Sequence, residues 1–277
     1  MKVDKTMRLA AARLKGKRPI ERDVGIRVGV DLGTAYTVVM VTDADGVPLA
    51  GASVFADVVR DGIVWDFAGA TRVVTELKDA VERRTGRRLT AGAVTIPPSV
   101  SASDHRAHGY VLEGAGIACT AVVDEPTAAN AVLGVRDGAV VDIGGGTTGV
   151  AILRDGQVVA THDEPSGGTH LSLVIAGALG VSFEEAEKLK CDPANHARLL
   201  PIVTPTLEKV STIVRTGLAG HRVEHLYLVG GTAAFAGIAP VMTRITGVPC
   251  EVAPEPMLVT PLGVASCADV LTEGAFR

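Results

Sequence analysis

Two aspartates, Asp31 and Asp142, each end an apolar stretch and precede a glycine-rich turn that contains threonine. Backbone N–H groups at such a bend can approach a phosphate closely, because glycine has no Cβ in the way. A carboxylate at the end of the preceding strand can hold a Mg²⁺ ion that keeps most of its waters. A single copy would be typical of a plain strand end with an aspartate turn. Two copies predict a phosphate site with Mg²⁺ beside Asp31 and Asp142.

The two copies share one plan over about twenty residues each. They read VGVDLGTAYTVVMVTDADGVPLA and AVVDIGGGTTGVAILRDGQVVAT, at an offset of 111 residues. Each copy has an apolar strand, a glycine-rich turn, a second apolar strand and an Asp-Gly turn of the kind that closes a hairpin. The repeat therefore predicts two similar halves.

Strands and helices alternate around these hairpins. Apolar spacing and Gly or Pro boundaries predict the elements. The expected strands are residues 92–96, 120–124 and 225–229, and the expected helices are residues 72–84, 103–114, 125–134, 171–179, 182–189, 201–217 and 261–271. A β-β-β-α-β-α pattern used twice predicts a two-domain α/β protein with a cleft between its halves.

Composition limits the function classes. The 277 residues suit one large domain or two smaller ones, and 47% hydrophobic with 21% charged residues is ordinary for a globular protein. Aromatic residues make up only 3%, which speaks against a stacking platform for single-stranded nucleic acid. Outside residues 1–27 the chain has 18 basic and 28 acidic residues, which argues against a duplex DNA surface. We expect no nucleic-acid partner.

Residues 1–27 form a basic leader with nine Lys or Arg against three acids. Met7, Ala10, Ala11 and Leu14 have helical spacing within it. The leader is typical of a flexible solubilising tail. The alternative is a short helix in residues 1–20 that docks onto a partner protein.

The remaining chemical groups indicate no further site. The four cysteines lack the spacing of a zinc site, so we expect reduced thiols. Two long uncharged stretches, residues 165–183 and 225–243, contain Gly, Ser, Thr and His, unlike the ~20 continuous apolar residues of a membrane span. With no secretory signal visible, we expect a cytoplasmic protein without a membrane span.

Five segments in order resemble one superfamily. VGVDLGTAYT, VVDEPTAANAVLGV, VVDIGGGTTGVAIL, LYLVGGTAAFAGI and PLGVASCADVL are similar to the phosphate-1, connect-1, phosphate-2, adenosine and connect-2 segments of the actin, DnaK-chaperone and MreB ATPases. The resemblance runs over residues 28–270. Residues 59–70 and 93–107 resemble MreB-like proteins, and with the segment EEAEKLK and the overall length the chain most resembles the ethanolamine-utilisation EutJ-type chaperone-like proteins found with bacterial microcompartments.

The resemblance implies a fold and a division of the chain. It implies two actin-like (ribonuclease H-like) α/β domains with an interdomain nucleotide cleft. The leader would be residues 1–27, domain I residues 28–137 plus 262–277, and domain II residues 138–261.

The resemblance also implies ATP or ADP with Mg²⁺, and roles for individual residues. Asp31, Glu125 and Asp142 would be catalytic, with Asp31 and Asp142 holding Mg²⁺ through water and Glu125 orienting the attacking water or the metal shell. The implied phosphate contacts are Gly33, Thr34, Gly144, Gly145, Gly146, Thr147 and Gly168. The implied adenosine contacts are Glu187, Lys190, Gly230, Gly231 and Thr232. Glu187 and Lys190, three residues apart, could instead be a solvated surface pair.

Departures from the superfamily pattern predict slow turnover. Gly149 stands where many relatives carry an acid, and Thr169 and His170 stand where chaperones have two acids. The catalytic lysine region of the chaperones has no counterpart. Since phosphoryl transfer depends on positioning and charge stabilisation, we expect ATP binding with weak hydrolysis.

These features predict a nucleotide-switched chaperone-like or reactivating factor whose client is an enzyme or a microcompartment shell protein. An MreB-like filament with head-to-tail contacts is the first alternative. A small-molecule kinase is the second, although such chains are usually much longer.

Overall fold

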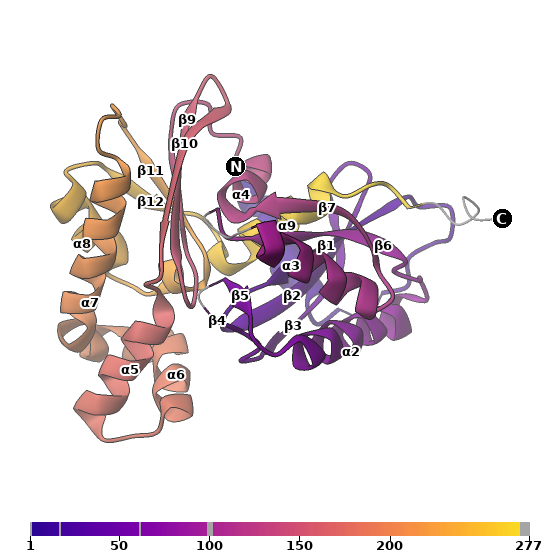
Figure 1. Cartoon of the computed structure of the whole chain (residues 1–277), viewed down its shortest axis with the longest axis horizontal. Helices are drawn as coiled ribbons and strands as arrows, with labels where there is room; N and C mark the ends of the chain where they lie inside the picture. The colour runs from indigo at the N-terminus through magenta and orange to yellow at the C-terminus, as the bar shows by residue number, and fades with distance from the viewer. Residues whose placement is uncertain (1, 17, 61, 99–101, 272–277) are drawn as a thin grey trace. The chain divides into compact units, whose positions relative to one another are not determined.

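The computed structural model describes residues 2–16, 18–60, 62–98 and 102–271. The chain forms two compact units (Figure 1). Unit 1 comprises Met1–Gly134 and Leu258–Arg277, and unit 2 comprises Val135–Met257. Each unit contains a five-stranded sheet with helices, so the expected pair of α/β domains is confirmed.

The two sheets have the same topology. Their strand orders are β3-β2-β1-β6-β7 in unit 1 and β10-β9-β8-β11-β12 in unit 2. Three antiparallel strands are followed by two parallel ones in both. The strands of unit 1 are β1 (Ile26–Leu32), β2 (Tyr36–Asp43), β3 (Pro48–Phe55), β6 (Ala91–Ile96) and β7 (Ala118–Asp124), with the short pair β4 (Val59–Arg60) and β5 (Ile63–Val64). Those of unit 2 are β8 (Gly138–Ile143), β9 (Thr148–Arg154), β10 (Gln157–Glu164), β11 (Leu226–Val229) and β12 (Cys250–Val252).

The sequence repeat is also a repeat of strand register. Asp31 lies opposite Val38 on β2, and Asp142 lies opposite Gly149 on β9. Both pairs are related by the 111-residue offset. The two hairpins are therefore equivalent residue by residue.

Unit 1 includes a helix from the C-terminal part of the chain. α9 (Val259–Cys267) packs on α4 (Glu125–Leu133) and β1. A Cβ at Gly263 would overlap the Ala128 carbonyl oxygen, so only glycine allows the two helices this approach. The other helices of this unit that follow β1 are α2 (Phe67–Thr85) and α3 (Ala102–Gly114).

The last helix is shorter than the expected 261–271. It ends at Cys267, and the Arg27 guanidinium donates to the carbonyl oxygens of Ser266 at 2.8 Å and Ala268 at 3.1 Å. Leu271 then forms a β-bridge with Ile26. The backbone past Cys267 is thus held by β1 instead of continuing the helix.

The leader is part of unit 1 within the described residues. α1 (Lys2–Arg13) packs against β3, and its Met7 and Ala10 side chains are fully buried. Arg84 of α2 donates to the Leu14 carbonyl oxygen at 2.8 Å and also to the Gly51 carbonyl oxygen. Of the two expectations for the leader, the short helix is thus the one observed, and its apolar face is covered by its own unit instead of being free for a partner.

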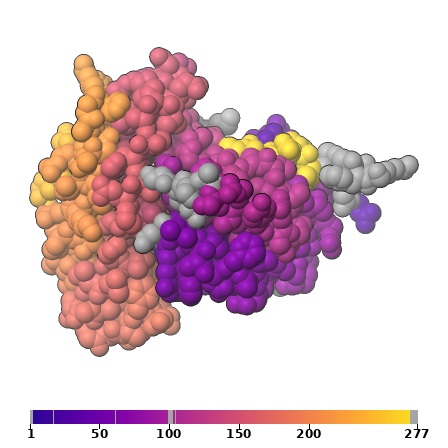
Figure 2. Space-filling model, in the orientation of Figure 1, coloured from indigo at the N-terminus to yellow at the C-terminus, as the bar shows by residue number. Residues whose placement is uncertain are grey.

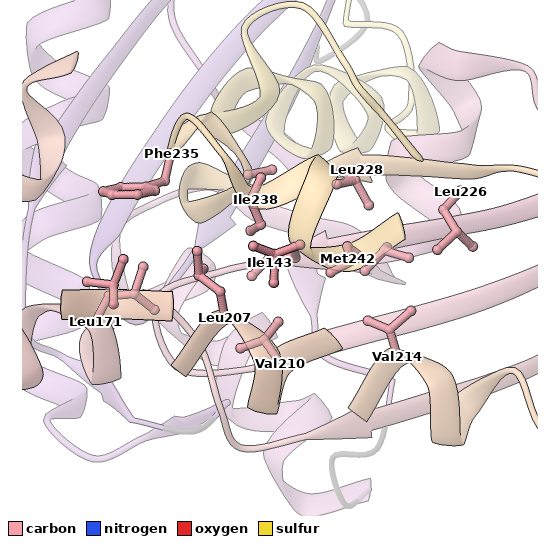
Figure 3. Packing of buried hydrophobic residues seen from close by; sticks show 14 of the residues in the cluster. Ile143, Leu171, Leu207, Val210, Val214, Leu226, Leu228, Phe235, Ile238 and Met242 are labelled. Carbon is pink, nitrogen blue, oxygen red and sulfur yellow. The ribbon is translucent and has the colours of Figure 1, made fainter. Parts of the chain in front are cut away.

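Unit 2 surrounds its sheet with four α-helices among the described residues: α5 (Gly168–Leu179), α6 (Phe183–Cys191), α7 (His196–Gly217) and α8 (Ile238–Thr246). Figure 3 shows the core, where α5, α7 and α8 meet β8 and β11. The labelled side chains are Ile143, Leu171, Leu207, Val210, Val214, Leu226, Leu228, Phe235, Ile238 and Met242.

α7 begins five residues before the expected start at Pro201. Pro201 and Pro205 both lie inside it, although each removes a backbone donor. The buried stripe that includes Leu199, Val203 and Leu207 continues past both prolines, which lie on the exposed side of the helix. Apolar burial against the sheet thus outweighs the local cost of proline.

Among residues 2–16, 18–60, 62–98 and 102–271, no helix has the length and apolar character needed to cross a membrane.

Candidate functional site

The turn of unit 1 joins β1 to β2. Its first N–H, from Gly33, donates to the Tyr36 carbonyl oxygen at 3.2 Å. A Cβ at Gly33 would lie 2.8 Å from that oxygen, so the turn requires glycine. Thr34 follows and is partly buried. The turn thus presents its backbone at the end of β1, as the sequence predicts.

Asp31 and Glu125 lie at one edge of the unit 1 sheet. Asp31, near the end of β1, accepts a hydrogen bond from the Thr95 hydroxyl of β6 at 2.6 Å. Glu125 is the first residue of α4, directly after Asp124, whose carboxylate caps the helix by accepting from the Thr127 N–H at 2.9 Å. Because β1, β6 and β7 are parallel, their carboxyl ends meet at this edge. The structure therefore brings the predicted carboxylates of unit 1 to the same edge as its turn.

The turn of unit 2 joins β8 to β9 and repeats the closing bond of unit 1. The Gly144 N–H donates to the Thr147 carbonyl oxygen at 3.0 Å. Asp142, two residues earlier, is only 5% exposed. Gly145 and Gly146 lie between the two bonded residues, so this turn contains three consecutive glycines.

The start of α5 is bonded to this turn. The Gly168 N–H donates to the Gly144 carbonyl oxygen at 2.9 Å, and the Thr169 N–H donates to the Gly145 carbonyl oxygen at 2.8 Å. A Cβ at Gly167 would lie within 2.6–2.9 Å of those two turn residues. The Gly-Gly pair therefore lets α5 approach the turn. The predicted contact of Gly168 with phosphate stays a prediction, and here its N–H holds the turn.

The turn after β11 touches the same region. Gly230 has a φ of 87°, and a Cβ there would overlap the Asp142 carboxylate. The Thr232 hydroxyl donates to the Gly144 carbonyl oxygen at 2.7 Å. Gly231, between them, begins a short 3-10 turn. The residues predicted for adenosine therefore lie against the predicted phosphate turn.

Glu187 and Lys190 form a buried ion pair on α6. The Lys190 ammonium lies 2.7 Å from Glu187 Oε2, and the side chains are 10% and 9% exposed. The ammonium also donates to the Gly168 carbonyl oxygen at 3.1 Å, and the Ser172 hydroxyl donates to Glu187 Oε2 at 2.5 Å. The alternative of a solvated surface pair is therefore wrong. In Figure 2, α5 and α6 form the salmon surface at the lower left, within unit 2.

The ion pair determines the charge state of Glu187. Burial by itself raises the pKa of Glu187, but the charge of Lys190 and hydrogen bonds from Lys190, Ser172 and Cys191 outweigh it. The pKa of Glu187 is consequently lower than its ordinary value. The carboxylate stays charged and holds Lys190 beside the start of α5.

His196 supports the ion pair and was not found from the sequence. Its ring, 4% exposed, bonds through Nε2 to the Lys190 carbonyl oxygen at 2.8 Å. Its Nδ1 accepts the Ala236 N–H at 3.0 Å, and the ring stacks on Phe235 with centroids 4.2 Å apart. With these partners Nε2 is the ring donor and Nδ1 the ring acceptor. No spacing rule connects His196 with Ala236, which lies 40 residues further along the chain.

Asp163 is a second residue that the sequence did not reveal. It lies on β10, opposite Gly149, and Gly149 in turn lies opposite Asp142. Burial, followed by the negative charge of Asp142, raises the pKa of Asp163 to about 6. Within the part of the chain that the structure describes, Asp163 Oδ1 is buried without a hydrogen-bond partner.

These groups fit one kind of metal. Mg²⁺ takes oxygen ligands, retains several waters and needs only one or two carboxylates from the protein. Asp142 and the unpartnered oxygen of Asp163 supply such oxygens beside the glycine turn. The described residues contain no group of three or more His, Cys, Asp or Glu side chains suited to a metal ion. The donor set thus fits a hydrated hard cation.

Sequence comparisons match two related families to parts of the chain. The family model for cell division protein FtsA matches residues 139–263. The MreB/Mbl protein model matches residues 56–184.

Relatives match the chain over nearly its whole length. Ethanolamine utilization protein EutJ of Escherichia coli (strain K12) is 39% identical over 96% of this chain and 94% of its own length. The crystal structure of EutJ from Carboxydothermus hydrogenoformans is 43% identical, covers 96% of this chain and 98% of its own, and has a TM-score of 0.89.

A distant structure has the same fold. MreB 5 of Spiroplasma citri, bound to AMPPNP, has a TM-score of 0.71 at 15% identity, over 88% of this chain and 95% of its own. The resemblance to actin-like ATPases is thereby confirmed for the fold. The EutJ proteins, in contrast, are 39% and 43% identical over 96% of this chain. Identity of that extent shows that the chain belongs to the family of ethanolamine utilization protein EutJ.

Proposed function

We propose that this chain binds adenine nucleotide with Mg²⁺, hydrolyses ATP slowly, and acts as a chaperone-like or reactivating factor in bacterial ethanolamine utilisation. One observation carries the proposal. The Gly144 turn, next to the buried Asp142, is approached by α5 and by the Gly230 turn at places where only glycine fits. Such an arrangement of backbone with a neighbouring carboxylate suits a polyphosphate and its cation.

Each group in unit 2 has a distinct part in this proposal. Gly145, Gly146 and Thr147 offer backbone N–H groups to phosphate oxygens, and the Gly144 N–H closes the turn that presents them. Asp142 would hold Mg²⁺ by accepting hydrogen bonds from its waters, and the ion would supply positive charge to the phosphates. The Lys190 ammonium donates to Glu187 and Gly168, and its third N–H can bind a hydroxyl group of the sugar.

The residues of unit 1 have proposed parts as well. Asp31 is oriented by the Thr95 hydroxyl, so its carboxylate can accept from a metal-bound water. Glu125, at the first turn of α4, is proposed to orient the attacking water. Gly33 and Thr34 are proposed phosphate contacts.

Weak hydrolysis follows from what stands opposite Asp142. Gly149 occupies the position facing it on β9 and carries no carboxylate. Since phosphoryl transfer needs positioned charge as well as binding, binding without fast chemistry is the expected balance. A turnover on the order of 10 s⁻¹, typical of a dedicated enzyme, would contradict slow hydrolysis.

Nucleotide binding is the first test. Titration with a fluorescent ATP analogue in the presence of Mg²⁺ should show saturable binding by the unaltered chain. Asp142→Asn should remove it, whereas Asp155→Asn should leave it unchanged. Asp155 lies at the other end of β9 with its side chain 91% exposed, and asparagine tolerates its φ of 52°. Equal loss in both variants, or no binding by the unaltered chain, would refute the proposal.

The proposed client is an enzyme or shell protein of the microcompartment, and the proposed location is the cytoplasm in association with that compartment. The support is family membership. Pull-down with and without non-hydrolysable ATP should capture a compartment protein in one nucleotide state more than in the other. Capture that is independent of nucleotide would refute a nucleotide-switched role.

The leader offers only a limited surface to such a client. Met7 and Ala10 are buried in unit 1, so a partner would contact the charged face, where Arg8 is exposed. Arg8→Glu should then weaken capture. Unchanged capture would place the client surface elsewhere.

A filament-forming role is the second candidate. The match of the MreB/Mbl model to residues 56–184 favours it. Sedimentation with ATP and Mg²⁺ discriminates the two roles, because a filament pellets in proportion to protein above a critical concentration. A client factor stays in the supernatant.

A further inference from the structure

Two carboxylates of unit 2 lie on one row across three strands. Asp142 on β8 faces Gly149 on β9, and Gly149 faces Asp163 on β10. Directly opposed residues of antiparallel strands project from the same face of a sheet. Glycine has no side chain to separate its two neighbours. Both carboxylates therefore project on the same side of the sheet, with no side chain of β9 between them.

A hydrated Mg²⁺ ion can contact both carboxylates from that position. Neighbouring strands are ~4.8 Å apart, so the two outer backbones are roughly 9–10 Å apart. A carboxylate oxygen that bonds a metal-bound water lies about 4 Å from the ion. Two such oxygens on opposite sides of one ion span this row.

Asp163 is half-buried, and one oxygen of its carboxylate is fully buried. Its Oδ1 atom has no hydrogen-bond partner within the described residues. The charges that act on it most are those of Asp142, His162 and Glu164, and two of these three are negative. His162 lies 3.1 Å from Glu164, so its ring is engaged with that neighbour. A cation between Asp142 and Asp163 would relieve the repulsion and satisfy the oxygen.

Gly149 on β9 carries no carboxylate, and Asp163 supplies one on the next strand along the same row.

We propose that Asp163 is the second carboxylate of the Mg²⁺–nucleotide site in unit 2, holding the hydrated ion together with Asp142. The inference rests on the proposed function, since the ion enters with the nucleotide. Asp163 is a positioning residue, because it acts through the waters of the ion.

The experiment measures ADP binding by calorimetry with and without Mg²⁺, for the full chain and for Asp163→Asn. Loss of a group in the outer shell of a metal typically weakens the metal by about 10- to 100-fold. Asp163→Asn should therefore need about 10- to 100-fold more Mg²⁺ to reach the same ADP affinity. Its ADP affinity without Mg²⁺ should equal that of the unaltered chain. Glu164→Gln is the matched control, since it removes one negative charge from the next position of β10, and its Mg²⁺ requirement should not change.

Thermal unfolding supplies a readout independent of activity. Without metal, Asp163→Asn should melt at a higher temperature than the unaltered chain, because the repulsion with Asp142 is gone. Addition of Mg²⁺ and ADP should raise the melting temperature of Asp163→Asn by less than it raises that of the unaltered chain. If Asp163 had a purely structural role, Asp163→Asn would instead melt at a lower temperature than the unaltered chain without metal. Asp163→Glu, which keeps the charge, should retain most of the Mg²⁺ dependence and serves if the asparagine variant does not fold.

Two outcomes distinguish a failure of this inference from a failure of the proposed function. ADP binding that shows the same Mg²⁺ dependence in Asp163→Asn and in the unaltered chain would overturn the role of Asp163 alone. Absence of ADP binding by the unaltered chain, with or without Mg²⁺, would overturn the proposed function and this inference with it.

Discussion

The turns of the two units are equivalent in backbone and different in surroundings. Gly33 and Gly144 make the same closing hydrogen bond at equivalent positions of two sheets that share one topology. In unit 1 the preceding Asp31 is held by a hydroxyl from the next strand of the sheet. In unit 2 the carbonyl oxygens of the turn are bonded by the start of α5 and by Thr232. The repeat thus supplies one frame, and the connections outside it make the two ends chemically distinct.

The difference arises after the third strand of each sheet. In unit 1 the chain continues from β3 into the short β4 and β5 before a helix begins. In unit 2 it passes from β10 almost directly into α5, and then into α6 with its buried ion pair. A helix that begins so close to the sheet can place its first N–H groups on the turn. Four changes test whether contacts around the turn contribute more to the stability of unit 2 than to that of unit 1. They are given from the largest expected effect to the smallest.

Lys190→Met should have the largest effect. It leaves the Glu187 carboxylate buried without its cation, and breaking a buried pair in this way typically costs 3–5 kcal/mol. We expect urea unfolding to show a loss of about 3–5 kcal/mol in the free energy of unfolding. The double variant Glu187→Leu with Lys190→Met should recover much of it, because no lone charge remains. A single variant as stable as the unaltered chain would show that α6 does not depend on the pair.

Gly230→Ala should come next. Its φ of 87° and the overlap of a new Cβ with Asp142 both oppose the change. Gly220→Ala is the control, because Gly220 has a φ of 82° and open space where a Cβ would lie. It measures the cost of the backbone conformation alone, which we expect to be about 1–2 kcal/mol in the free energy of unfolding. Gly230→Ala should cost about 1–3 kcal/mol more, as overpacking does. Equal losses in thermal or urea unfolding would mean that the Asp142 contact is unimportant.

Thr95→Val examines the simpler turn of unit 1. It removes the hydroxyl that donates to Asp31, and a single hydrogen bond contributes about 1 kcal/mol. We expect that loss in urea unfolding, with recovery in Thr95→Ser, which keeps the donor. A loss as large as that of Lys190→Met would remove the contrast between the two turns.

The pH dependence of Glu187 should be the smallest effect. Its folded pKa is below the ordinary value of 4.5, so its charge stabilises the folded state above pH 4.5, and this stabilisation is lost as the pH falls through the lower folded pKa. The difference in melting temperature between the unaltered chain and Glu187→Gln should be constant from pH 7 to 5 and shrink below 4.5. A difference that grows on acidification would contradict the sign of the shift.

Much of the fold and part of the site could be predicted from local patterns. The two hairpins and the start of α4 at Glu125 follow from strand periodicity, turn residues and a capping aspartate, all of which act over a few residues. The start of α7 could not be predicted, since Pro201 marks a boundary by local rules and burial of a distant face overrides it. His196 was also missed, because its partners come from α6 and from the segment before α8.

By itself the sequence determined the two Asp-Gly-Thr hairpins, their 111-residue spacing and the family, because these are patterns along the chain. Only the tertiary structure decided that Glu187 and Lys190 are buried and that Asp163 lies on the same row of the sheet as Asp142. A bulge between Val158 and Ala160 shifts β10 by one residue. Without that shift, Asp163 would lie opposite Thr148 instead of Gly149. Register depends on the packing of the whole sheet, so no local pattern could place that carboxylate on its row.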